Sequence, residues 1–195
     1  MIKIRENDTD ESLFERLTSS EASREVVEGI QKRAEGRKLL VTGTGRCGTV
    51  FASRVFGLPH ESYFNLEPDL TRTLDSEVSC LAVPCLTWLD PDEWYVVHLV
   101  RHPQKVVGSL KVCLVNQKAV TWILYNYLTM DVVEYYERCI RRVDWYAPDE
   151  ELRVEDLGRS NINSGGLVIF DQDERLRPYV ERFGYEWLNK WGDPE

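Results

Sequence analysis

Long hydrophobic runs are missing from this chain of 195 residues. No uncharged apolar stretch approaches the roughly 20 residues that span a membrane, and the first residues are polar, without the apolar segment of a secretory signal. Paired cysteines are missing too: the five cysteines are odd in number and include no Cys-x-x-Cys pair, which argues against a disulfide framework and a zinc site. We therefore expect a cytoplasmic protein without a membrane span or a metal site.

Acidic residues are missing from two long stretches, although the chain as a whole is acidic. It holds 33 Asp and Glu against 24 Lys and Arg, a net charge of -9, so we expect no nucleic-acid partner. Residues 37–59 and 94–130 contain no acid; their bases include Arg37, Lys38, Arg46 and Arg54 in the first and Arg101, Lys105, Lys111 and Lys118 in the second. Buried parts of a parallel sheet also lack acids, but they usually lack bases as well, so we favour one shared anion site.

Hydrophobic periodicity predicts a single α/β domain with a mostly parallel central sheet flanked by helices. Residues 38–42 and 95–100 read as buried strands, each followed by a helix, over 49–56 and from Pro103 to about 115. Residues 151–155 read as a third strand. We assign residues 1–36 to an N-terminal extension and helix, and residues 37–195 to the domain.

Two further segments are less regular. A stripe of apolar residues predicts one long helix from about Ala119 to Arg142. Residues 75–89 are ambiguous between helix and strand, because their apolar run is short and Pro84 interrupts it.

A glycine-rich turn, Gly43-Thr-Gly-Arg-Cys-Gly-Thr49, joins the first strand to the next helix. Such a turn presents backbone N–H groups and a helix N-terminus to an anion. Its glycine spacing is that of a Walker A loop, but Thr49-Val50 stands where a nucleoside triphosphatase carries Lys and then Ser or Thr. ATP hydrolysis is therefore disfavoured, and Arg46 supplies the cation. The alternative is a turn with no phosphate, which many α/β proteins contain.

Two segments resemble sulfotransferases that use 3′-phosphoadenosine 5′-phosphosulfate (PAPS). Residues 39–49, Leu-Leu-Val-Thr-Gly-Thr-Gly-Arg-Cys-Gly-Thr, are similar to the 5′-phosphosulfate loop of that family. Residues 97–109, Val-His-Leu-Val-Arg-His-Pro-Gln-Lys-Val-Val-Gly-Ser, are similar to its 3′-phosphate segment. Weaker similarities follow at residues 57–61 and 152–157. The resemblance implies a P-loop-like sulfotransferase architecture.

The resemblance also implies which residues hold the donor. Arg101 and Ser109 would hold the 3′-phosphate of PAPS, and the loop would hold its 5′-phosphosulfate. The loop set is Gly45, Arg46, Cys47, Gly48, Thr49 and Val50. Sulfuryl transfer from PAPS leaves adenosine 3′,5′-bisphosphate (PAP) and requires no metal ion. Like phosphoryl transfer, it is an in-line displacement, which a protein accelerates by positioning the reactants and by electrostatic stabilisation.

The acceptor hydroxyl or amine, on a small molecule or a carbohydrate, needs a general base within hydrogen-bond reach. Glu61 is our first choice and His60 the second, because both follow the helix that begins at the loop. Arg46 would stabilise the sulfuryl group in transfer. The alternatives are a solvated loop carboxylate at Glu61 and a histidine bonded to backbone at His60. We expect His98, in the middle of a strand, to be a core histidine.

The chain also departs from the family pattern. Val50 replaces a frequent Ser or Thr, Cys47 replaces a common Ser, and His102 and Gln104 replace the acidic and basic residues often found beside the proline. No segment matches the C-terminal loop that covers the adenine. A catalytically decayed nucleotide-binding module is therefore the first alternative function, and a P-loop nucleotide kinase the second.

Overall fold

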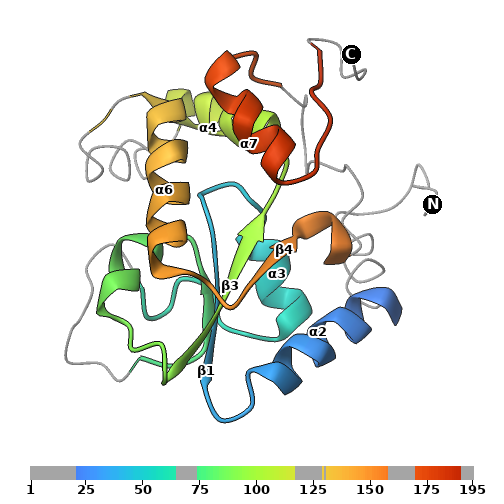
Figure 1. Ribbon diagram of the computed structural model, residues 1–195, viewed down its shortest axis with the longest axis vertical. Coiled ribbons are helices and arrows are strands. Elements are labelled where there is room, and N and C mark those ends of the chain that lie inside the picture. Colours follow the sequence, from blue (N-terminus) through green and yellow to red (C-terminus); the bar gives the residue numbers. More distant parts are fainter. Residues whose placement is uncertain (1–20, 65–73, 117–128, 130, 158–169, 190–195) are drawn as a thin grey trace.

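The computed structural model describes residues 21–64, 74–116, 129, 131–157 and 170–189. Its elements alternate along the chain between helices and parallel strands (Figure 1). In order they are α2 (Glu21–Arg33), β1 (Lys38–Thr42), α3 (Thr49–Phe56), β2 (Glu77–Ser79), the 3₁₀ helix η1 (Val83–Trp88), β3 (Trp94–Val100), α4 (Pro103–Asn116), α6 (Val132–Tyr146), β4 (Glu150–Arg153), the 3₁₀ helices η2 (Val154–Leu157) and η3 (Glu174–Leu176), and α7 (Arg177–Arg182). The predicted α/β class is confirmed.

The four strands form one parallel sheet in the order β2-β1-β3-β4. The two central strands carry the core, because all seven residues of β3 and the last four of β1 are buried. Continuous apolar runs of this kind suit strands that are covered on both faces. Within the described ranges, no helix is long and apolar enough to cross a lipid bilayer.

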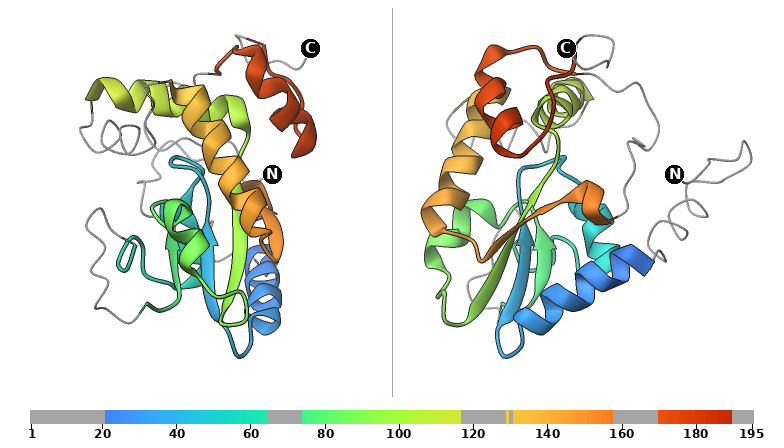
Figure 2. Two further views of the ribbon diagram at one scale, coloured as in Figure 1. Left: turned by 60° about the vertical axis from the view of Figure 1, so that its left-hand side comes forward. Right: turned by 45° about the vertical axis from the view of Figure 1, so that its right-hand side comes forward.

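Helices cover both faces of the sheet (Figures 1 and 2). Helices α2 and α3 lie together on one face with η2, whereas α6 lies on the other with η1. Helix α2 buries Val27 and Ile30, and Ser23 Oγ donates a hydrogen bond of 2.7 Å to the carbonyl oxygen of Leu157. The helix predicted in the N-terminal extension therefore packs into the same core as the rest of the chain.

The strand order places a topological switch point between β1 and β3. From β1 the chain runs to β2 on one side, and from β3 it runs to β4 on the other. These neighbours are in parallel register, with Thr42 opposite His98, so they end at the same edge. In parallel α/β sheets, ligands bind at the carboxyl edge where connections diverge. The glycine-rich loop and Arg101 follow these two strand ends.

The prediction of one long helix from Ala119 to Arg142 is wrong at its centre. Helix α6 begins at Val132, because the Asp131 side chain accepts hydrogen bonds from the backbone N–H groups of Val133 and Glu134. Such a cap satisfies amides that have no partner within the helix. The helix also continues to Tyr146. Residues 117–128 and 130 lie outside the described part of the chain.

The ambiguous segment 75–89 holds elements of both kinds, strand β2 and then η1. Pro84 lies in the first turn of η1, where a missing N–H group does no harm. The third predicted strand is confirmed, over Glu150–Arg153.

The close approach of β1 to β3 predicts a severe effect of Gly43→Ala. A Cβ atom at Gly43 would lie 2.2 Å from the carbonyl oxygen of Leu99, so we expect a loss of about 2 to 3 kcal/mol in the free energy of unfolding, as for an overpacked core. Gly29→Ala is the control, because its Cβ would meet only the flexible Arg33 side chain and alanine favours helix α2 by up to about 1 kcal/mol. Urea denaturation measures both; equal stability of the two variants would contradict this account.

Candidate functional site

The glycine-rich loop curls tightly at the end of β1. Arg46 has a φ of 71° and Gly48 a φ of 110°, both in the left-handed region. That conformation favours glycine and is uncommon for arginine. Gly43 permits the loop to begin directly against the backbone of β3, so the turn and the end of β3 are adjacent.

Two hydrogen bonds of its backbone hold the loop in place. The backbone N–H of Gly45 donates to the hydroxyl of Tyr135 on α6 at 3.3 Å, and the N–H of Cys47 donates to the carbonyl oxygen of Thr44 at 3.2 Å. Cys47 is 1% exposed, so its side chain belongs to the core. The sulfur of Cys47 therefore packs beneath the loop and is not part of its outer surface.

Helix α3 begins at the loop without an acidic residue in its first turn. Gly48, the residue before the helix, has no side chain to cap it. The first N–H groups of a helix lack intrahelical partners and attract anions. Thr49 is buried, whereas Val50 is 53% exposed beside the loop, so position 50 presents a hydrophobic surface instead of a hydroxyl.

The two acid-free stretches meet at this edge of the sheet. Arg46 Nε donates a hydrogen bond of 3.0 Å to Ser109 Oγ on α4. Arg101 Nη1 donates to the carbonyl oxygen of Arg46 at 3.3 Å, and Arg101 is only 7% exposed. Burial lowers the pKa of the Arg101 guanidinium from its usual value, and the negative charge of Glu155 partly opposes this shift. Three residues assigned to phosphate binding are therefore in one place.

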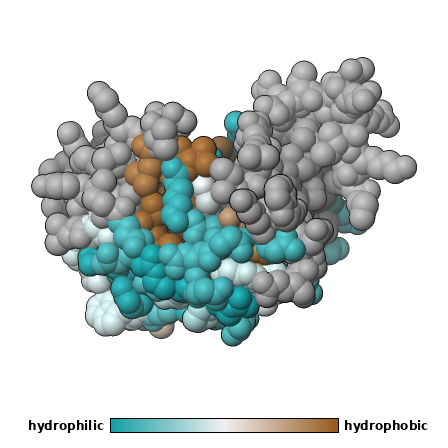
Figure 3. All heavy atoms as spheres, turned by 90° about the horizontal axis from the view of Figure 1, so that it is seen from above, coloured by the Kyte–Doolittle hydropathy of each residue, from teal (hydrophilic) through white to brown (hydrophobic). Residues whose placement is uncertain are grey.

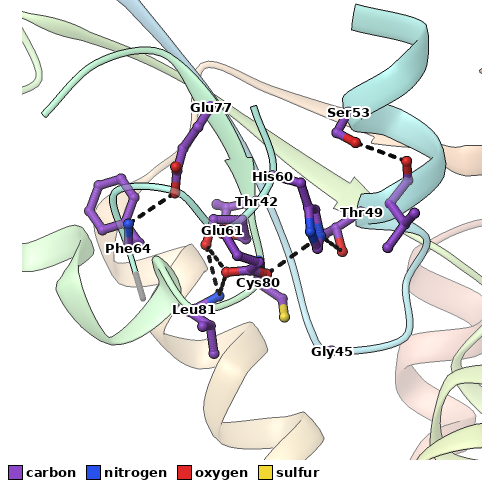
Figure 4. A network of polar contacts seen from close by, with 12 residues as sticks. Thr42, Gly45, Thr49, Ser53, His60, Glu61, Phe64, Glu77, Cys80 and Leu81 are labelled. Atoms are coloured by element: carbon purple, nitrogen blue, oxygen red, sulfur yellow. Dashed lines mark hydrogen bonds and ion pairs between the residues drawn. The ribbon is translucent and has the colours of Figure 1, made fainter. Parts of the chain in front are cut away.

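His60 follows the end of α3 in the chain, but its side chain reaches back to Thr49 at the start of that helix (Figure 4). Its Nε2 is 3.0 Å from Thr49 Oγ1 and 3.6 Å from a carboxylate oxygen of Glu61. The backbone around it is fixed beside β2, because the N–H of Val78 donates to the carbonyl oxygen of Pro59 at 2.9 Å. The imidazole is partly exposed and faces the helix N-terminus.

The Glu61 side chain forms hydrogen bonds with the residues at the end of β2 and just after it. Its carboxylate accepts hydrogen bonds from Ser79 Oγ at 2.5 Å, from Cys80 N–H at 2.9 Å and from Leu81 N–H at 3.4 Å (Figure 4). The φ of Glu61 is 52°, so the chain turns sharply there. Both carboxylate oxygens are engaged, which is not the environment of a solvated loop carboxylate.

A second carboxylate, Glu77, binds the backbone of the residues that follow Glu61. It is fully buried and accepts hydrogen bonds from the N–H groups of Ser62, Tyr63 and Phe64. Burial raises its pKa, and these three amides oppose the shift. Each acid thus fixes the segment that carries the other. The sequence does not reveal Glu77, because a single acid within a short strand carries no recognisable signal.

The two residues that depart from the family pattern beside Pro103 bind the C-terminal segment. His102 Nε2 donates to the carbonyl oxygen of Glu186 at 2.9 Å, and its ring packs against the Tyr185 ring at a tilt of 39°. Gln104 is fully buried and forms hydrogen bonds with both the N–H and the carbonyl oxygen of Leu188. These contacts join the start of α4 to residues 185–188, which sequence analysis left unassigned.

Comparison with protein-family models, with characterised proteins and with solved structures finds no match. The site therefore has to be interpreted from its own geometry. Among the described residues, no three His, Cys, Asp or Glu side chains are grouped as a metal ion would require.

The prediction that His98 is a core histidine is confirmed. His98 is fully buried in β3, and its Nδ1 lies 3.4 Å from a carboxylate oxygen of Glu151.

The surroundings of His102 predict a pH-dependent stability. Burial lowers its pKa from 6.5 to about 4, so its contribution is complete above pH 6.5 and is lost as the pH falls toward 4. Between pH 7 and 4.5 the wild type should lose roughly 2 to 3 kcal/mol more unfolding free energy than His102→Gln, which retains an N–H donor but does not titrate. Urea denaturation at the two pH values measures the difference, and identical losses would refute it.

Proposed function

We propose that the protein is a sulfotransferase that moves a sulfuryl group from PAPS to an acceptor hydroxyl or amine, with a P-loop-like sulfotransferase architecture. The observation that carries the proposal is the hydrogen bond between Arg46 and Ser109. It joins the loop expected to bind the 5′-phosphosulfate to the helix expected to bind the 3′-phosphate. One nucleotide with phosphates on both sides of its ribose suits two such adjacent anion sites.

The donor would lie across the ends of β1 and β3. The first amides of α3 and the loop backbone would hold the 5′-phosphosulfate. Arg101 and Ser109 would hold the 3′-phosphate, since a guanidinium can grip a phosphate with two parallel hydrogen bonds. Arg46 would sit between the two phosphates, because its side chain already reaches Ser109 from the loop.

The proposed reaction is an in-line displacement at sulfur. The acceptor oxygen or nitrogen forms a bond to the sulfur atom while the bond from sulfur to the bridging phosphate oxygen breaks. That oxygen leaves as part of the 5′-phosphate of PAP, and the helix N-terminus and Arg46 stabilise its negative charge. The acceptor proton passes to the general base.

The geometry favours His60 over Glu61 as this base. Glu61 Oε1 and Oε2 already accept hydrogen bonds from three donors of residues 79–81. The His60 Nε2 is within 3.0 Å of Thr49 Oγ1, in the first turn of α3, where the sulfuryl group would be held. Once protonated, the imidazole would face the Glu61 carboxylate at 3.6 Å. Glu61 would then be a positioning residue that also stabilises the imidazolium.

The acceptor would approach from the side of His60 and Val50, past the outer surface of the loop. The proposed acceptor class remains a small molecule or a carbohydrate. Figure 3, which views the molecule from above, shows hydrophobic residues at the surface among hydrophilic ones. Val50, exposed beside the loop, would contact the acceptor or donor through its methyl groups.

Thermal unfolding with nucleotides tests the donor site. PAP at about 100 times its Kd should stabilise the protein by roughly 2.7 kcal/mol, whereas ADP and ATP with Mg²⁺ at the same concentration should stabilise it much less, because they lack a 3′-phosphate. Stabilisation by ATP with Mg²⁺ alone would instead indicate a nucleotide kinase. No response to any nucleotide would contradict the donor site.

Two matched variants test the base. With PAPS and an acceptor found by screening phenols, sugars and amines, His60→Gln should lower kcat by about 10²- to 10⁴-fold, the usual contribution of a general base, and leave the Kd for PAP within about twofold. Glu61→Gln should lower kcat less and reduce the unfolding free energy more, since it disturbs three hydrogen bonds. A larger loss of kcat in Glu61→Gln than in His60→Gln would restore Glu61 as the base.

A further inference from the structure

Ser79, the last residue of β2, has a fully buried side chain. Its hydroxyl donates a hydrogen bond of 2.5 Å to Glu61 Oε2 and accepts one of 3.1 Å from the N–H of Leu81. Buried hydroxyls are almost always hydrogen-bonded, but here the partner is a carboxylate beside the proposed base. The proposed function gives a role to Glu61 and none to Ser79.

The Ser79 hydroxyl forms the shortest hydrogen bond to Glu61 Oε2. The other hydrogen bond to this oxygen comes from the N–H of Leu81 and is long, at 3.4 Å. The second oxygen, Oε1, accepts from the N–H of Cys80 at 2.9 Å and lies 3.6 Å from His60 Nε2. The last side-chain torsion of a glutamate is broadly distributed, so these hydrogen bonds determine which oxygen lies toward the imidazole.

Ser79 also lies on a path of contacts between the two ends of the glycine-rich loop. At one end, Thr42 Oγ1 donates a hydrogen bond of 2.6 Å to the carbonyl oxygen of Ser79. At the other end, Thr49 Oγ1 is 3.0 Å from His60 Nε2 (Figure 4). Glu61 joins the two halves, because its carboxylate contacts both Ser79 and His60. The path therefore fixes the imidazole relative to the loop that would hold the sulfuryl group.

We propose that Ser79 is a positioning residue for sulfuryl transfer: its hydroxyl orients Glu61, and Glu61 in turn orients His60. The inference rests on the proposed function, since it takes His60 as the base. The acceptor's proton passes to His60, whereas Ser79 keeps its own proton throughout. The imidazolium that forms is stabilised by a carboxylate oxygen that lies toward it. A hydrogen bond from a hydroxyl to a carboxylate is strong enough to hold that orientation.

Steady-state kinetics with PAPS and the acceptor found by screening, together with calorimetric titration by PAP, test this inference. Ser79→Ala should lower kcat by about 10-fold, the effect of one hydrogen bond to a charged group, and leave the Kd for PAP within about twofold. The matched control is Ser23→Ala, which removes an equally buried hydroxyl that bonds a carbonyl oxygen far from the loop. Its kcat should equal that of the wild type.

A double variant separates positioning from a structural role. If Ser79 acts through Glu61, then Ser79→Ala combined with Glu61→Gln should have the kcat of Glu61→Gln alone, within about twofold. The reason is that a neutral amide does not stabilise the imidazolium, however it is oriented. Two losses that multiply in the double variant would overturn the inference, because Ser79 would then act independently of Glu61.

The outcomes also separate this inference from the proposed function. If the wild type neither binds PAP nor turns over PAPS, the proposed function fails and the inference fails with it. If the wild type turns over PAPS and Ser79→Ala is as active as Ser23→Ala, only the inference fails. Should Ser79→Ala not fold in urea controls, Ser79→Cys takes its place, because a thiol is a similar but much weaker donor. A kcat of Ser79→Cys equal to that of the wild type would overturn the inference.

Discussion

The contact between the loop after β1 and the backbone of β3 determines the rest of the site. Gly43 lies so close to the carbonyl oxygen of Leu99 that a side chain there would meet it at 2.2 Å. This approach brings the glycine-rich loop beside the end of β3. The start of α3 and the start of α4 then face one edge of the sheet, each without an acidic residue in its first turn.

Electrostatics explain why the acids of this acidic chain lie where they do. The two stretches without Asp or Glu converge at the carboxyl edge, so no carboxylate of theirs would compete with the anion that the proposed function places there. Glu61 and Glu77, beside and within β2, accept hydrogen bonds from backbone N–H groups and from the Ser79 hydroxyl. Such bonds disperse the charge of each carboxylate and also fix the segment on which His60 lies.

The sequence predicted the site's two main segments, because both depend on local signals. A buried apolar run and a glycine-rich turn define β1 and the loop, and a β-branched run followed by Pro103 defines β3 and α4. The sequence does not predict the start of α6, because apolar residues occur on both sides of Asp131 and hide the cap there. A pattern of apolar residues alone does not reveal where a helix begins.

Contacts between distant parts of the chain could not be predicted. The hydrogen bonds of Gln104 with Leu188 join residues 84 positions apart, and Tyr135 supports Gly45 across 90 positions. Amide and hydroxyl side chains form such bonds in many contexts, so their identity gives no partner. The preference for His60 over Glu61 has the same origin, because it depends on what the folded backbone offers to each side chain.

The central claim is that the ends of β1 and β3 form one site for a nucleotide with phosphates at both the 5′ and 3′ positions. Its most direct test is an amide NMR titration with PAP and with adenosine 5′-monophosphate. PAP should shift the resonances of residues 43–50 and of residues 101–109 together, with one binding constant. The monophosphate should shift chiefly those of residues 43–50. Shifts confined to one segment with PAP, or two separate binding constants, would contradict the account.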